Sequence, residues 1–157
     1  QLQVLVTTHS GGVYALDGAN GEILWHTQLD HDIFGSPVTA ELGTRHQDVV
    51  VATINGFDVL TGEHGHVLDA TVIRTTGFQN APLITKDANG TIGITVVGYQ
   101  VHDSVAAHFE ILGSDADNVD GPGSWPQFHH DPQLTGNATA PVVAPLSTGA
   151  RGPTSTR

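Results

Sequence analysis

The chain has 157 residues, and its 5 Lys and Arg against 16 Asp and Glu give a net charge of −11 with neutral His. Such an acidic surface repels phosphate backbones and anionic lipids, which excludes nucleic acid and bare membrane surfaces as expected partners. The chain has no Cys, which excludes disulfides, thiol catalysis and Cys-based metal sites. No apolar run approaches the ~20 residues of a membrane span, and 19 Gly with 8 Pro favour a turn-rich β protein.

The first clear element is a β-hairpin over residues 11–25 (GGVYALDGANGEILW). Two apolar runs, 13–16 and 22–25, flank a turn rich in Gly, Asp and Asn, which is a strong hairpin signal. A β-rich run over residues 1–8 precedes the hairpin. The sequence therefore predicts three strands within residues 1–29.

A second hairpin follows at a fixed distance. Residues 56–68 read GFDVLTGEHGHVL, and Gly56 and Gly65 stand 44 residues after Gly12 and Gly21. Two strands are predicted before it: one over 33–40, and one over 48–54 that is almost wholly apolar. A run that is apolar on both faces is typical of a strand buried between two sheets. Residues 34–73 thus predict one complete four-stranded unit.

A third unit is predicted over residues 78–112. Residues 78–85 repeat residues 34–40 when Phe78 is aligned with Phe34, and Pro82 then follows Pro37 by 45 residues, one more than the offset of the hairpins. Further strands are expected at 92–99 and 105–112. A 44-residue period with four strands per unit is typical of β-propellers, whose rings contain 4–8 blades.

The predicted fold class is all-β: a partial β-propeller of about three four-stranded antiparallel blades with an irregular C-terminal tail. The blades are expected at 1–29 (partial), 34–73 (full) and 78–112 (last), followed by a linker and closing segment at 113–136 and a low-complexity tail at 137–157. Because three blades cannot close a ring, we expect remaining blades or other protein chains, a homo-oligomer among them, to pair with the exposed strand edges. With no Met in the chain, a fragment, a processed product and a complete subunit all stay open.

The first hairpin resembles the repeat of PQQ-like (quinoprotein-type) β-propellers, whose blades share the pattern A-x-D-x-x-T-G-x-x-x-W. The matching residues are Ala15, Asp17, Gly21 and Trp25, with Asn20 in the Thr position. The second hairpin has Val59, Thr61, Gly65 and Asp69 in those places, so that only the Gly is retained. The resemblance implies that Trp25 packs between neighbouring blades, and that Asp69 removes one such contact.

Residues 34–40 and 48–52 resemble FG-GAP or VCBS-type propeller repeats, which hold Ca²⁺ in the loop between these strands. Here that loop, 41–47, has one acid and an Arg, which is too few oxygen ligands for Ca²⁺. The remaining calcium candidates are Asp87 with Asn89, and the linker acids Asp115, Asp117 and Asp120. A plain turn and solvated linker acids are the interpretations that we favour for these two sets.

Residues 125–136 are similar to a W-P-x-F-x-x-D-x-x-x-T-G segment found beside the first or last blade in bacterial PQQ-like propeller proteins, many of them secreted. The matching residues are Trp125, Pro126, Phe128, Asp131, Thr135 and Gly136. The resemblance implies a structural role, with Trp125 and Phe128 anchoring the chain against a blade. It also implies a secreted or cell-surface location.

No catalytic set can be assigned from the residues. A PQQ-dependent dehydrogenase needs a complete ring, a Ca²⁺ site, stacking residues and a buried Asp base, so we expect no cofactor and no PQQ, and calcium at the two sets of residues named above is the alternative. We therefore expect a non-catalytic structural or binding module. Two alternatives stay open: a fragment of a PQQ-dependent dehydrogenase, and a surface or filament subunit that strand exchange between copies completes.

Overall fold

The computed structural model describes residues 2–42, 46–73, 77–100 and 103–111. These residues form β-strands β1 to β11 and contain no helix. The predicted all-β class is confirmed for this part of the chain.

The strands form three antiparallel sheets that follow one another along the chain. The first sheet contains β1 (Gln3–Thr7), β2 (Gly12–Asp17) and β3 (Ile23–Gln28), in that order. The middle sheet has the order β4 (Val38–Ala40), β5 (Asp48–Thr53), β6 (Gly56–Thr61) and β7 (Val67–Val72). In the third sheet β8 (Gly77–Phe78) and β9 (Leu83–Lys86) both pair with β10 (Ile92–Gln100), whose other neighbour is β11 (Asp103–Ile111).

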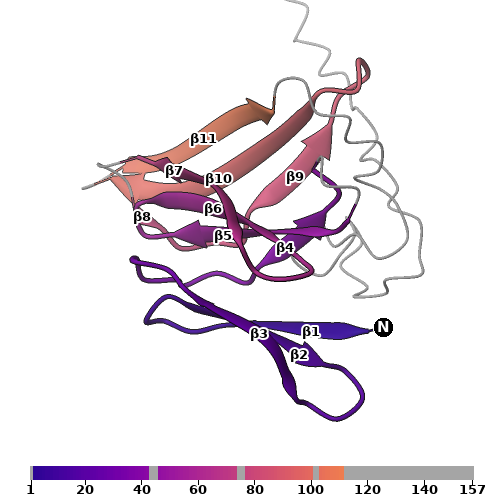
Figure 1. The fold of residues 1–157 in the computed structure, drawn as a ribbon. Coiled ribbons are helices and arrows are strands. Elements are labelled where there is room, and N and C mark those ends of the chain that lie inside the picture. Colours follow the sequence, from indigo (N-terminus) through magenta and orange to yellow (C-terminus); the bar gives the residue numbers. More distant parts are fainter. Residues whose placement is uncertain (1, 43–45, 74–76, 101–102, 112–157) are drawn as a thin grey trace, which may run out of the picture.

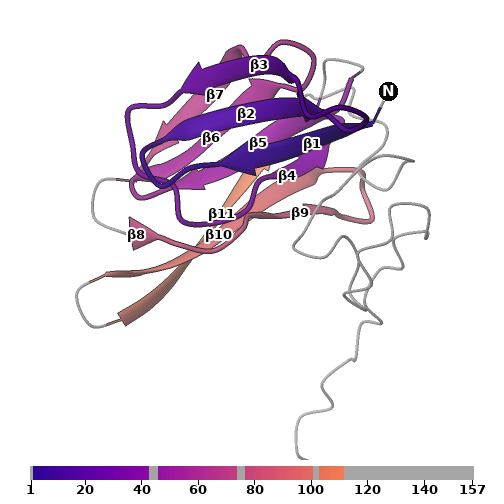
Figure 2. The ribbon, with the colours of Figure 1, turned by 90° about the horizontal axis from the view of Figure 1, so that it is seen from below.

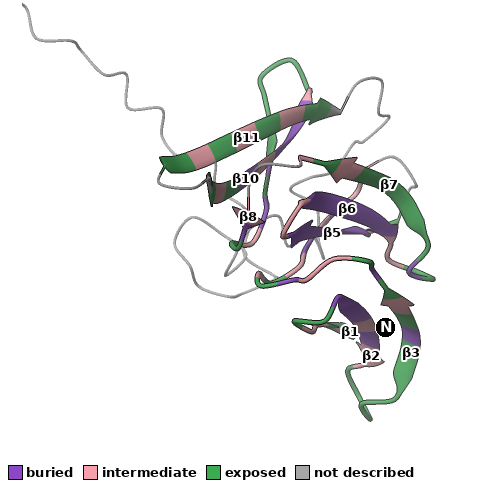
Figure 3. Cartoon of the chain, turned by 90° about the vertical axis from the view of Figure 1, so that its left-hand side faces the viewer, coloured by how far each residue is buried: buried purple, intermediate pink, exposed green. Residues whose placement is uncertain are grey.

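The three sheets are stacked face to face, with the middle sheet between the other two (Figures 1 and 2). A first core lies between the first and middle sheets and contains Val13, Ala15, Trp25, Leu29, Ile33, Val49, Val51 and Leu60. A second core lies between the middle and third sheets and contains Val38, Ala40, Val50, Ala52, Phe57, Val59, Phe78, Ile84, Ile92, Ile94 and Val96. Because β5 supplies alternate residues to both cores, all six of its residues are buried (Figure 3), as its apolar run predicts.

The hairpins β2–β3 and β6–β7 have the same geometry. The register of the first shifts between Ala15 and Leu16, and that of the second between Val59 and Leu60, 44 residues later. A bulge at the same place in both hairpins increases the local twist in the same way. The repeat seen in the sequence is therefore a structural repeat.

The strand that precedes each apolar strand is interrupted. Ile33 forms an isolated bridge to Thr53, and the ladder resumes in β4 after residues 34–37. In the third sheet Phe78 pairs with Gly98, and the ladder resumes in β9 after residues 79–82. Each interruption ends in a proline, Pro37 or Pro82, which has no N–H to donate to a ladder.

These pairings correct the alignment of Phe34 with Phe78. The counterpart of Phe78 is Ile33, 45 residues earlier, which is the same offset that relates the two prolines. Ile33 and Phe78 are both buried, whereas Phe34 is 45% exposed. The one-residue insertion relative to the hairpins therefore lies before Phe78, and not between Phe78 and Pro82.

Candidate functional site

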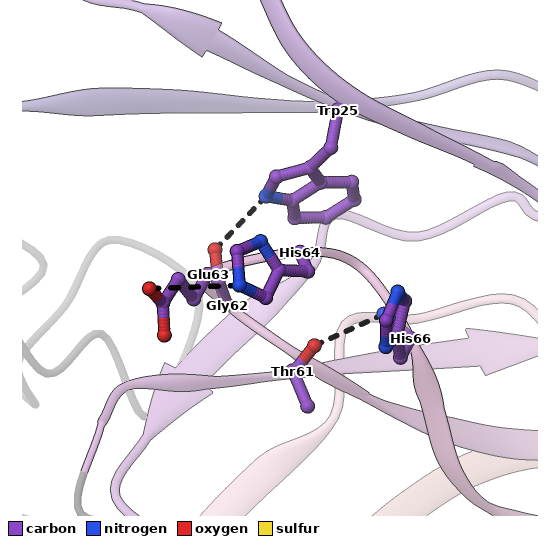
Figure 4. A network of polar contacts seen from close by, with 6 residues as sticks. All are labelled: Trp25, Thr61, Gly62, Glu63, His64 and His66. Atoms are coloured by element: carbon purple, nitrogen blue, oxygen red, sulfur yellow. Dashed lines mark hydrogen bonds and ion pairs between the residues drawn. The ribbon is translucent and has the colours of Figure 1, made fainter.

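The first and middle sheets are joined by Trp25 (Figure 4). Its side chain is 8% exposed, and its Nε1 donates a hydrogen bond of 2.9 Å to the carbonyl oxygen of Gly62, in the turn between β6 and β7. Thr27, two residues along β3, donates from Oγ1 to the carbonyl oxygen of Gly65 in the same turn. Trp25 thus connects the two sheets, and its buried indole N–H has the hydrogen-bond partner that such a group needs.

The turn between β6 and β7 allows the indole of Trp25 to approach its backbone closely. Gly65 has a φ of +70°, and a Cβ at this position would overlap the indole ring of Trp25. The turn is closed by Gly65 N–H donating to Thr61 O at 2.8 Å, and by His66 N–H donating to Oγ1 of Thr61 at 3.0 Å. The His64 and Glu63 side chains in Figure 4 are exposed, and their 3.5 Å ion pair is of the solvent-screened kind that contributes little to stability.

The turn between β2 and β3 has the same construction but no indole in it. Gly21 has a φ of +77° and donates to Asp17 O at 2.8 Å, as Gly65 does to Thr61. The Asp17 carboxylate accepts from Ala19 N–H at 2.7 Å, which is a turn-forming contact. A Cβ at Gly21 would meet nothing within 4 Å. Gly18 and Gly21 therefore present the same arrangement as Gly62 and Gly65, open to solvent.

Asp69 takes the place of Trp25 in the middle sheet. Its side chain is exposed, and one carboxylate oxygen accepts from Ala70 N–H at 2.8 Å. A groove of about 400 Å³ lies here between the middle and third sheets, lined by Leu42, Phe57, Val59, Leu68, Asp69, Thr71, Ile94, Phe109 and Glu110. The indole of Trp25 fills the space between the first and middle sheets, whereas the corresponding space between the middle and third sheets is this groove.

The outer face of the first sheet is apolar. In the middle sheet Val49 pairs with Leu60 and both are buried; in the first sheet the corresponding pair is Val4 and Leu16. Val4 is 46% exposed because none of the described strands lies beyond it. The same face carries the exposed side chains of Leu2, Val6 and Ile23, and the stacked rings of Tyr14 and His26.

The outer face of the third sheet is mixed: the exposed side chains of Leu83, Val97 and Tyr99 lie on it together with a polar cross-strand pair. Thr95 and His108 are cross-strand partners, and Oγ1 of Thr95 lies 2.7 Å from Nδ1 of His108. The His108 ring covers Gly93, where a Cβ would overlap it. Both outer faces of the described stack thus carry exposed apolar side chains.

A cleft between the first and middle sheets contains a buried acid. The cleft has a volume of about 350 Å³ and is lined by Gln28, Leu29, Asp30, His31, Thr53, Asp58, Val67, Ala70, Thr71 and Val72. Asp58 is 8% exposed, and burial is the main cause that raises its pKa above the ordinary 3.8. Nearby Asp30 and Asp69 also raise this pKa, whereas His31 lowers it.

Of the calcium candidates, the structure describes Asp87 and Asn89. The Asp87 carboxylate accepts from the backbone N–H of Asn89 and of Thr91, each at 2.8 Å, and these bonds hold its pKa below the ordinary value. That is the geometry of a tight turn, in which the oxygens already have donors. Within the described ranges, no group of three or more His, Cys, Asp or Glu is placed to hold a metal ion.

Several predicted residues lie outside the described residues: Asp115, Asp117, Asp120, Trp125, Phe128, Asp131 and Gly136. The described motif residues Asp17, Gly21, Trp25, Pro37 and Pro82 lie in turns, in the inter-sheet joint and at strand interruptions, not in one pocket.

Sequence reasoning missed Asp58. Its signal was available, because it is an acid between Phe57 and Val59 in a strand whose partner β5 is almost wholly apolar. An acid in such a position is buried whichever face it occupies.

Comparison with known proteins returned no assignment: no protein-family model matches the chain, and no curated protein matches it in sequence. In the part of the chain that the structure describes, no helix has the length and apolar character to cross a membrane.

Proposed function

We propose that the chain is a non-catalytic structural or binding module, formed by the C-terminal blades of a larger or multi-chain β-propeller of the PQQ-like kind. In this proposal its functional surface is the outer face of the first sheet, which receives a further sheet of the same repeat. The resemblance of residues 125–136 to segments of secreted propeller proteins supports a location outside the cytoplasm.

The observation that carries the proposal is the equivalence of Val4 with Val49. Both pair with a Leu on the next strand, yet the exposed fraction is 46% for Val4 and 1% for Val49. Because the middle sheet buries this face against the first sheet, the same face of the first sheet fits a further sheet. Burying it removes apolar surface from water at about 25 cal/mol per Å².

The empty turn at Gly21 supports the same proposal. An incoming sheet of this repeat type would bring a Trp to Gly18 and Gly21, as Trp25 comes to Gly62 and Gly65. The partner is therefore defined chemically as a β-sheet with an apolar face and one projecting indole.

The test is the association state of the whole chain in solution, measured by sedimentation over a range of concentrations. We expect the wild-type chain to associate through its exposed first sheet, and Val4→Glu with Val6→Glu to give a single-chain species. Val97→Glu is the matched control, because Val97 has a similar exposed fraction (42%) on the outer face of the third sheet. A wild-type chain that is a monodisperse monomer and unfolds cooperatively would overturn the proposal.

A further inference from the structure

The cleft between the first and middle sheets holds an acid that the proposed function does not use. Asp58 lies in β6, opposite Val51 of β5 and Ala70 of β7. Phe57 and Val59 point into the second core, so Asp58 points the other way, toward the first sheet, as Leu60 does. Its counterpart in the first sheet is Tyr14, which stacks on His26 in a half-exposed position.

Asp58 is 8% exposed, and no described residue donates a hydrogen bond to its carboxylate, whose oxygens open onto the cleft. The charged groups that affect it are His31, Asp30 and Asp69, two of which repel its negative charge. His31 is the one group of the three that favours the charged carboxylate, and its Nδ1 lies 3.2 Å from the side-chain amide of Asn55.

The shape of the cleft favours a cation with a hydrocarbon stem. Leu29, Val67 and Val72 give it apolar walls, while Asp58 and the exposed Asp30 provide negative charge at the side and the mouth. Neither Lys nor Arg occurs among the residues that line it. The net charge of −11 attracts a positively charged ligand from a distance.

We propose that this cleft binds an aliphatic ammonium group, with the Asp58 carboxylate as its counter-ion. The methylene stem packs on Val67 and Val72 and keeps water away from the ion pair, which strengthens the attraction. The ammonium donates to the unpartnered carboxylate and so offsets the desolvation of Asp58. Such a group can come from a free amine or from a lysine side chain of a partner protein.

The test is carboxyl-carbon NMR of the Asp-labelled whole chain, titrated with pH. Three probes are compared: 1,4-diaminobutane, a short peptide with one central Lys, and Ca²⁺. With an amine probe at saturation, we expect the pKa of Asp58 to fall relative to the free protein, because a bound cation favours the charged form. Amine binding should strengthen as pH rises through the pKa of Asp58. Tighter binding of 1,4-diaminobutane would indicate a free amine as the natural ligand, and tighter binding of the Lys peptide would indicate a lysine side chain of a partner protein.

Variants separate this site from general attraction to an acidic surface. Asp58→Asn keeps the shape of the side chain and should weaken amine binding about tenfold or more. Glu63→Gln removes one charge from an exposed turn and should leave binding unchanged. The proposal is overturned if neither amine shifts the Asp58 resonance, if Asp58→Asn binds as well as wild type, or if Ca²⁺ alone produces the shift.

Discussion

The joint at Trp25 can be tested by placing the same methyl group in two equivalent turns. Gly65→Ala and Gly21→Ala substitute glycines with φ of +70° and +77° at corresponding places in the repeat. The added Cβ would overlap the indole of Trp25 at Gly65, but would meet nothing within 4 Å at Gly21. The two variants share the backbone cost and differ in the contact with Trp25.

The expected difference follows from that contact. An Ala in the left-handed region costs about 1–2 kcal/mol in either turn. Only at Gly65 does overpacking against the indole add about 1–3 kcal/mol, and displacement of Trp25 from Gly62 O about 0.5–1.5 kcal/mol more. Gly65→Ala should therefore destabilise the chain more than Gly21→Ala by about 1.5–4.5 kcal/mol.

The measurement is urea denaturation of both variants in the Val4→Glu, Val6→Glu background, so that association does not contribute. A third arm repeats the pair with Trp25→Ala, where the excess cost at Gly65 should disappear because the overlapping ring is gone. Equal destabilisation by the two Ala variants, or an excess cost that survives Trp25→Ala, would refute the assignment of this joint.

Three further changes have defined outcomes. Asp69→Trp should fill the groove between the middle and third sheets and stabilise the chain by about 0.5–2 kcal/mol in urea denaturation; an unchanged or lower stability would show that the groove does not accept an indole. Asp58→Asn should be more stable than wild type near neutral pH and equal to it below about pH 3.8, because a raised folded-state pKa means that stability is lost as pH rises through it. A pH-independent difference between these two proteins would contradict the burial of the charge. Asp87→Ala should speed amide hydrogen exchange at Asn89 and Thr91, and in wild type the same bonds should weaken as pH falls through the lowered pKa of Asp87; unchanged exchange at both amides would remove Asp87 from the turn.

The repeat and the hairpins could be predicted from the sequence because their signals are local. The glycines at positions 21 and 65 specify the turn, and the apolar run of β5 specifies a strand buried on both faces. Trp25 as an inter-sheet contact came from the resemblance, and the structure supplies its partner, Gly62.

The remaining features depend on which residues face each other across the stack. The interrupted strands misled the alignment, since Ile33 and Phe78 share a structural position but not a residue type. The polar pair on the third sheet's outer face, Thr95 with His108, joins residues that lie 13 apart in the sequence. Likewise, Asp58 lacks a hydrogen-bond donor because the described residues of the first sheet, which it faces, do not provide one.

The two outer faces of the stack differ in shape and side chains, but each carries exposed apolar groups. The face around Val4 carries Leu2, Val6 and Ile23, and the face around the hydrogen-bonded pair of Thr95 and His108 carries Leu83, Val97 and Tyr99. Contacts between two such unlike surfaces form open fibres when they do not close, so a stack with both faces uncovered has a route to fibre growth.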